Sequence, residues 1–436
     1  MSHKSTLFVV AFVTGLLTGG AAALLKDVIS RISHSLTDGM STTGGNYILL
    51  VIPVVGILLT GIYVRYILRD NIEHGVTLLL ANISGHRPML APHLIYGPMV
   101  ASSLTLGFGG SAGSEGPIAY TGAAIGSNVA RWLGMPPKII MIMVGCGAGA
   151  GIAGIFKAPV GGILFTLEVL KMEMTTVSVV ALIIAALTSA VTAYVLSGCT
   201  FDVTWSDNVP FSPDILPWVI ALGVFCGLYA FYYALVMKRL GAFYDKISNP
   251  WVKNLSSGIL LAVLVFLFPS LYGEGYGVIT EIINGNDRAL FNDSLFSADT
   301  PSVSSLIMIT AGVLLVKCWA ACSANSGGGV AGDFAPTLFA GAMAGLLFAS
   351  LANAVTGAHV STANFAMMGM AAVMAGAIRA PLMAIFLTVE MADSYSFFLP
   401  IVIAATISYA IVKALTPGSF YSMAQIRRIK EQSPRQ

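Results

Sequence analysis

Charged residues are scarce in this chain. Only 10% of the 436 residues are Asp, Glu, Lys or Arg, whereas 56% are hydrophobic, and soluble domains carry roughly a quarter charged residues. This composition excludes a water-soluble globular protein. The net charge is +2 and no cluster of Lys or Arg occurs before the C-terminal end, so the chain also lacks the basic surface typical of nucleic-acid binding.

Cysteine is scarce as well. Most of the five cysteines lie within apolar runs, and the closest pair has no His beside it, so the spacing of a metal site is missing. We expect them to be small buried residues and predict neither a metal nor a cofactor. They are Cys146, Cys199, Cys226, Cys318 and Cys322.

Apolar runs, in contrast, recur from end to end. Several reach the roughly 20 residues that a helix needs to cross a bilayer. Shorter runs contain Gly and Pro, which predicts broken helices whose free backbone groups are buried in protein or line a cavity. We therefore predict an all-α, polytopic membrane protein. The clearest runs are Leu7 to Leu25, Tyr47 to Val64, Ile139 to Ile155, Val177 to Leu196, Leu216 to Leu235, Ile259 to Phe268, Leu306 to Val316 and Leu399 to Leu415.

The two ends of the chain predict its orientation. The first apolar run, Leu7 to Leu25, is long for a signal peptide and is followed by further spans, which favours a retained membrane helix. Lys4 precedes this run, and a basic tail at 426–436 follows the last one. Because positive residues favour the cytoplasmic side, we expect both termini there.

An internal repeat divides the chain into two halves. Gly113 to Pro117 (Gly-Ser-Glu-Gly-Pro) recurs 219 positions later as Gly332 to Pro336 (Gly-Asp-Phe-Ala-Pro). Lys157 to Glu168 recurs 222 positions later as Arg379 to Glu390, with Lys/Arg-Ala-Pro, Ile and Glu in matching places. Repeats that contain interrupted hydrophobic segments place the substrate site where the halves meet.

The repeated Gly/Pro segments also predict a chemistry. Gly113 to Pro117 is typical of a loop that turns into a helix near Glu115, and the segment from Gly332 predicts a second helix start. A helix N-terminus attracts anions without a Lys or Arg. Two converging helix starts would form an anion site that binds loosely enough for release.

Glu115 is unusual at such a site, because a carboxylate within a membrane segment is rare and functional by default. The ionised side chain would occupy the place of the permeant anion, and the protonated side chain would leave it. The alternative is a capping glutamate without a role in transport.

These residues carry a family resemblance. Gly113 to Pro117 resembles the motif Gly-(Lys/Arg)-Glu-Gly-Pro of the CLC chloride channels and chloride/proton antiporters. Gly332 to Pro336 resembles the family's Gly-x-Phe-x-Pro, and Phe420 to Ser422 its pore-lining tyrosine segment. The resemblance implies one membrane domain over 1–436, built from two inverted repeats at 1–200 and 215–425.

The resemblance also implies a function. It predicts transport of chloride or another small anion, as a passive channel or coupled to protons, by a homodimer with one pore per subunit in the bilayer of a bacterial inner membrane. Glu115 would be the external gate. Because the sequence ends soon after Tyr421, we expect no regulatory C-terminal domain. The implied anion ligands are Gly113, Ser114, Gly116, Asp333, Phe334 and Tyr421.

Two residues depart from the family pattern near the anion. His74 replaces the serine of the central site, and it is either an anion-binding residue or a packed histidine. Asp333 stands at a place that is usually apolar, so its side chain either points away from the pore or is protonated there. An acidic residue at this place keeps a fluoride/proton antiporter of the same family as an alternative, whereas Pro117 in the gate motif favours chloride.

A third departure concerns protons. The internal glutamate of coupled antiporters would fall at Val169. Its neighbour Glu168 has a repeat mate in Glu390, which favours a structural role at a helix end. The candidate residues for a proton pathway are Glu115, Glu168, His74 and Asp333. The sequence does not decide whether the protein is a passive channel or a proton-coupled antiporter.

Two other classes of protein are less well supported. A membrane-embedded enzyme could use Glu115, His74 and Asp333 as acid/base groups, but no nucleophile or metal-ligand set accompanies them. A transporter of an organic substrate would need a roomier pocket with specific polar side chains. We therefore predict that the protein is not an enzyme.

Overall fold

A computed structural model describes residues 3–38, 46–70, 72, 75–200, 203, 212–292, 294–295 and 302–416. His74, Tyr421 and the basic tail at 426–436 lie outside these described residues. The described part of the chain contains sixteen α-helices and no β-strand, apart from one isolated bridge between Gly113 and Gly332.

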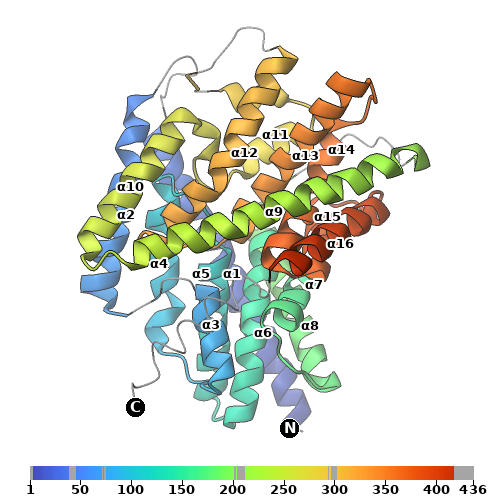
Figure 1. Cartoon of the computed structure of the whole chain (residues 1–436). Coiled ribbons are helices and arrows are strands. Elements are labelled where there is room, and N and C mark those ends of the chain that lie inside the picture. Colours follow the sequence, from blue (N-terminus) through green and yellow to red (C-terminus); the bar gives the residue numbers. More distant parts are fainter. Residues whose placement is uncertain are drawn as a thin grey trace.

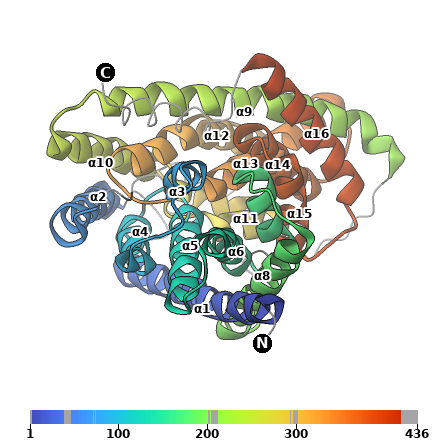
Figure 2. The same ribbon diagram turned by 90° about the horizontal axis from the view of Figure 1, so that it is seen from below.

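In the described ranges, each half contains eight α-helices, and their arrangement is shown in Figures 1 and 2. The first half comprises α1 (His3–Thr37), α2 (Ile52–Ile62), α3 (Gly75–Ser84), α4 (Gly97–Gly107), α5 (Glu115–Trp132), α6 (Pro137–Phe156), α7 (Pro159–Leu164) and α8 (Thr176–Leu196). The second half comprises α9 (Leu216–Asp245), α10 (Pro250–Leu267), α11 (Tyr276–Ile283), α12 (Val303–Ser326), α13 (Phe334–Thr356), α14 (Thr362–Ile378), α15 (Pro381–Met391) and α16 (Phe398–Leu415).

Helix length confirms the predicted polytopic, all-α membrane fold. Within the described ranges, nine helical segments are long and apolar enough to cross a bilayer, and shorter apolar helices lie between them. The first apolar run belongs to α1, which packs along α6 and α8. It is therefore an integral part of the helix bundle.

The packing pattern is repeated. In the first half α5 packs on α6, α6 on α8 and α1 on α8, and in the second half α13 packs on α14, α14 on α16 and α9 on α16. Equivalent helices also contact each other, since α2 packs on α10 and α7 on α15. Gly113 and Gly332, which are equivalent in sequence, form an antiparallel bridge. The antiparallel direction of this bridge is the one expected of two inverted halves that are related by a local two-fold axis.

Glycine permits the closest helix contacts in both halves. A Cβ atom added at Gly122 of α5 would lie 2.1 Å from the carbonyl oxygen of Gly147 in α6. The equivalent contact joins α13 and α14, where a Cβ at Gly341 would lie 2.3 Å from the carbonyl oxygen of Gly369. Because membrane helices associate through close packing of small residues, these glycines hold each repeat together.

The helix breaks are repeated too. Helices α6 and α14 are followed directly by Lys157 and Arg379, which adopt left-handed backbone conformations with φ of 56° and 63°. Pro159 and Pro381 then start α7 and α15. The Lys/Arg-Ala-Pro repeat is thus the sequence of a sharp turn between two helices.

Of the five cysteines, Cys146, Cys226, Cys318 and Cys322 are buried and unpaired, as expected. Cys199, which lies three positions beyond the end of α8, is exposed, contrary to the expectation.

Candidate functional site

Three helix starts converge at the centre of the described structure. The N–H of Gly113 donates to the carbonyl oxygen of Gly332 at 3.0 Å, and the reciprocal bond is also formed. A Cβ atom at Gly116 would lie 3.3 Å from the Cα of Gly332, and one at Gly75 would lie 2.8 Å from the carbonyl oxygen of Gly116. Glycine therefore brings the N-terminal ends of α3, α5 and α13 into contact.

Glu115 places its carboxylate between the starts of α5 and α13. The side chain is 1% exposed, and its Oε1 accepts a hydrogen bond from the N–H of Ala335 in the first turn of α13. A Cβ at Gly113 would lie 2.0 Å from Oε2, and one at Gly332 would lie 2.5 Å from it. Oε2 has no hydrogen-bond partner among the described residues. The carboxylate thus fills the space that an anion bound to these N–H groups would need.

Ser114, the N-cap residue of α5, is paired with a second carboxylate. Its N–H and its hydroxyl donate to Oε1 of Glu274 at 2.9 and 2.6 Å. Glu274 lies in the turn before α11 between Gly273 and Gly275, whose φ angles are 66° and 85°. The predicted anion ligand Ser114 therefore binds a side-chain carboxylate in this structure, and the sequence analysis did not identify Glu274.

A buried cation lies near both carboxylates. Lys317 of α12 is 0% exposed, and its Nζ donates to the hydroxyl of Ser111 at 2.8 Å. The same nitrogen lies 4.6 Å from the centre of the Phe339 ring, a cation–π contact. The ammonium interacts electrostatically with Glu115 and Glu274. The sequence analysis missed Lys317, although a lone Lys after the apolar run Leu306 to Val316 is a signal of function.

Asp333 and Phe334 lie at the start of α13, as predicted. Asp333 is 4% exposed, and its Oδ1 accepts a hydrogen bond from the amide of Asn325 near the end of α12. Its side chain is therefore turned toward α12. The Phe334 ring packs edge-on against Phe165 with 5.8 Å between ring centres. The N–H that binds the Glu115 carboxylate belongs to Ala335, one residue beyond the pair named from the sequence.

Glu168 and Glu390 form a symmetric pair of helix-start contacts. Glu168 accepts from the N–H groups of Leu382 and Met383 in α15, and Glu390 accepts from those of Val160 and Gly161 in α7. Each carboxylate thus offsets the free N–H groups of the equivalent helix in the other half. Among the described residues, no hydrogen bond joins Glu168 to Glu115 or to Ala335. A role for Glu168 in proton movement stays a prediction.

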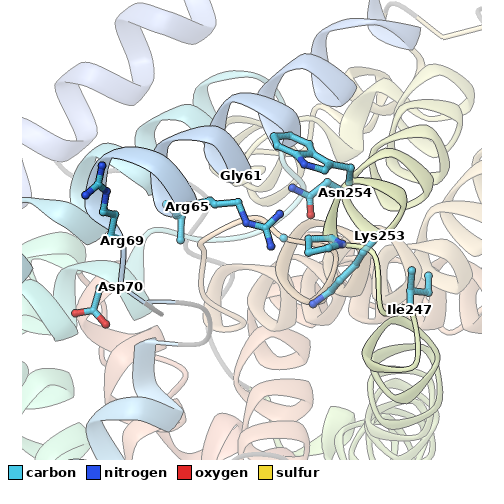
Figure 3. A pocket seen from close by; sticks show the side chains of 11 residues that line it. Gly61, Arg65, Arg69, Asp70, Ile247, Lys253 and Asn254 are labelled. Carbon is cyan, nitrogen blue, oxygen red and sulfur yellow. The ribbon is translucent and has the colours of Figure 1, made fainter.

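A pocket of about 540 Å³ opens between α2 and α10 (Figure 3). Its walls carry Arg65, Arg69 and Lys253, and its lining reaches Gly328 in the loop that precedes α13. The lining thus carries three basic residues and one acidic residue, Asp70, and Gly328 precedes Gly332 by four positions in the sequence. Sequence analysis did not identify it, because its basic residues are widely separated along the chain.

Comparison with known proteins agrees with the geometry of the site. Residues 56–413 match the family described as voltage gated chloride channel. The chain is an integral membrane protein of that family.

Two curated relatives illustrate the similarity. The chain is 26% identical to the H(+)/Cl(-) exchange transporter ClcA of Vibrio vulnificus, over 100% of this chain and 93% of that one. It is 27% identical to the voltage-gated ClC-type chloride channel ClcB of Escherichia coli, over 74% of this chain and 73% of that one.

Solved structures confirm the fold. A slow cyanobacterial Cl-/H+ antiporter has a TM-score of 0.83 at 22% identity, with 98% of each chain covered. A CLC-type fluoride/proton antiporter has a TM-score of 0.76 at 22% identity, with 96% of this chain and 97% of that chain covered.

Proposed function

We propose that the protein moves chloride across a bilayer through a pathway that passes between the starts of α5 and α13 and is gated by Glu115. One observation carries this proposal: the Glu115 carboxylate accepts from the N–H of Ala335 at the position where two helix starts meet. Family membership and the names of the relatives support chloride as the cargo.

The gate follows from competition for the same donors. An ionised carboxylate and a chloride ion both require N–H groups and a positive helix end, so they exclude each other at Ala335. Protonation removes the charge of Glu115, which weakens its hydrogen bond and ends its repulsion of the anion. Transport therefore increases as pH falls.

Passive flow and exchange for protons share this gate. In the exchange mode, the proton that releases Glu115 crosses the membrane in the opposite direction to chloride. The test is chloride efflux from liposomes that contain the purified protein, with an imposed pH gradient and with an uncoupler. Chloride-driven proton uptake identifies an antiporter, whereas chloride efflux that drives no proton movement identifies a channel. The absence of any chloride flux would refute the proposal.

Fluoride is the second candidate cargo. The motivating observation is Asp333, a buried carboxylate at the N-cap of α13, and a fluoride/proton antiporter is among the structures with this fold. Parallel efflux of chloride and fluoride from the same liposomes separates the two. Fluoride efflux that greatly exceeds chloride efflux would replace chloride as the cargo.

The assembly and orientation belong to the same proposal. We infer a homodimer in a bacterial inner membrane with both termini in the cytoplasm, and a transporter rather than an enzyme. Light scattering of the detergent-purified protein measures its oligomeric state. A thiol reagent that does not cross membranes reports the side on which Cys199 is exposed, and labels attached to either terminus report the ends.

A further inference from the structure

The pocket between α2 and α10 has no part in the mechanism proposed above. It lies where the apolar span Tyr47–Leu68 ends and the span Pro250–Leu267 begins. The two helices meet closely there, because Gly61 of α2 has no side chain to collide with the Asn254 amide of α10. With a volume of about 540 Å³, the pocket is far larger than a halide ion requires.

Two cationic side chains enter this pocket from opposite walls. Arg65 reaches toward α10 from the helical turn that continues α2, and Lys253 reaches into the same space from the first turn of α10 (Figure 3). The Arg65 guanidinium lies 6.0 Å from the centre of the Trp251 ring. Because like charges repel at short range, this arrangement favours an occupant with negative charge.

The side chains of the lining supply little negative charge. Asp70 is the one carboxylate in the described lining, and its Oδ2 lies 2.9 Å from Nε2 of His93. Among the described residues, neither Arg65 nor Arg69 forms an ion pair with a carboxylate. Arg69 is exposed, and its Nε donates to the carbonyl oxygen of Tyr66 at 3.1 Å. The lining therefore retains an excess of positive charge.

The aromatic residues at the pocket indicate the surface of a membrane. Trp251 stacks on Tyr66 with 6.3 Å between ring centres, and Tyr66 is 56% exposed. Trp and Tyr are enriched at the ends of membrane spans, at the level of the lipid headgroups. Ile62 of α2 and Leu255 of α10, each next in the chain to a lining residue, are 41% and 45% exposed. Apolar surface therefore continues from the pocket along both helices.

The order of the spans gives the side of the membrane. Helix α1 and the segment Tyr47–Leu68 are consecutive spans, so the end of the second span returns to the side of the N-terminus. The proposed orientation makes that side cytoplasmic, where the leaflet contains anionic lipids and basic pockets between membrane helices bind their headgroups. A phosphate suits the two cations, because a guanidinium binds two of its oxygens and an ammonium can bind a third.

The pocket is also linked to the start of α13. Its lining includes Gly328, in the loop between α12 and α13. The Ser257 hydroxyl of α10 donates to the carbonyl oxygen of Gly327 at 3.0 Å, so α10 holds this loop in place. The loop leads to Ala335, the hydrogen-bond donor to Glu115. An occupant that holds α2 and α10 together should therefore stabilise the helix start on which the gate closes.

We propose that this pocket binds the headgroup of an anionic phospholipid, with Arg65 and Lys253 as ligands of its phosphate. The acyl chains lie along the exposed apolar faces of α2 and α10, and the bound lipid supports transport by holding the loop before α13. The phosphate site is separate from the chloride pathway, and its assignment uses only the proposed orientation of the chain.

Native mass spectrometry of the detergent-purified protein measures the binding, with phosphatidylglycerol as the probe. Arg65→Gln and Lys253→Gln should each weaken retention of this lipid by about fivefold, whereas Arg65→Lys, which keeps the charge, should weaken it less. Lys138→Gln is the matched control, because Lys138 is an exposed basic residue in the first turn of another spanning helix, α6. Equal retention by the wild type and both Gln variants, or an equal loss in Lys138→Gln, would overturn the site.

Two competitors distinguish a lipid from a soluble phosphate compound. Phosphatidylcholine carries a phosphate without net charge, and it should displace phosphatidylglycerol poorly. Glycerol 3-phosphate carries the charged headgroup without acyl chains, and it should also displace the lipid poorly. If glycerol 3-phosphate competes as well as phosphatidylglycerol itself, the ligand is a soluble phosphate compound and the lipid assignment is wrong.

Chloride efflux from vesicles tests the effect on transport. Wild-type efflux should increase when phosphatidylglycerol is added to phosphatidylcholine vesicles. Arg65→Gln and Lys253→Gln should lose this increase and keep the wild-type rate in pure phosphatidylcholine. A lower rate of both variants in pure phosphatidylcholine would mean that the two cations attract chloride itself, which overturns the lipid site. Failure of the proposed function looks different, because no variant would then transport chloride while lipid retention would still depend on Arg65 and Lys253.

Discussion

Replacement of the gate carboxylate by its neutral amide tests the central proposal. In Glu115→Gln the side chain keeps its shape and can still accept from Ala335, but it no longer carries a charge. A hydrogen bond to a charged group contributes about 1.5–3 kcal/mol and a neutral one about 0.5–1.5 kcal/mol. The amide should therefore hold its place about 1–1.5 kcal/mol less tightly, so that chloride displaces it roughly tenfold more readily. Loss of the repulsion between Glu115 and the anion adds to this effect.

Two measurements follow from that magnitude. Calorimetry should show chloride binding to Glu115→Gln about tenfold tighter than to the wild type, and liposome efflux should lose most of its dependence on pH together with any coupling to protons. Glu115→Ala should go further and leave a passive pathway. Glu390→Gln is the matched control, since this carboxylate accepts from α7 instead. If both Glu115 variants keep the wild-type pH profile and coupling, and no halide appears near residue 115, the gate assignment is wrong.

Three further predictions address the surroundings of the gate. Gly113→Ala would place a Cβ 2.0 Å from Oε2 of Glu115, so it should displace the carboxylate and give pH-insensitive chloride efflux, whereas Gly277→Ala, with open space at its Cβ, should behave as the wild type. Tyr421→Phe should weaken calorimetric chloride binding by roughly 1 kcal/mol if its hydroxyl donates to the anion, and unchanged affinity would leave the ring as packing. In the Glu115→Gln background, His74→Ser should abolish the remaining change of transport between about pH 5 and 7, and an identical profile with and without this substitution would mark His74 as a core residue.

The sequence by itself determined the fold class, the repeat and the positions of the critical helix starts. Hydrophobic run length depends on bilayer thickness, and Gly/Pro spacing acts through local backbone geometry, so both are readable without the tertiary structure. The structure accordingly starts α5 at Glu115 and α13 at Phe334. Gly113 and Gly332, which the repeat relates in the sequence, form the antiparallel bridge in the structure.

Tertiary structure alone decided which groups meet across the repeats. Ser114 is 160 positions from Glu274, and Lys317 is 206 positions from Ser111. No local pattern encodes such a pairing, because it arises only when the inverted halves pack around their common axis. Packing also selected the Ala335 N–H as the partner of Glu115. The sequence thus specified a carboxylate at a helix start, and the packing of the two halves placed that carboxylate on the helix of the other repeat.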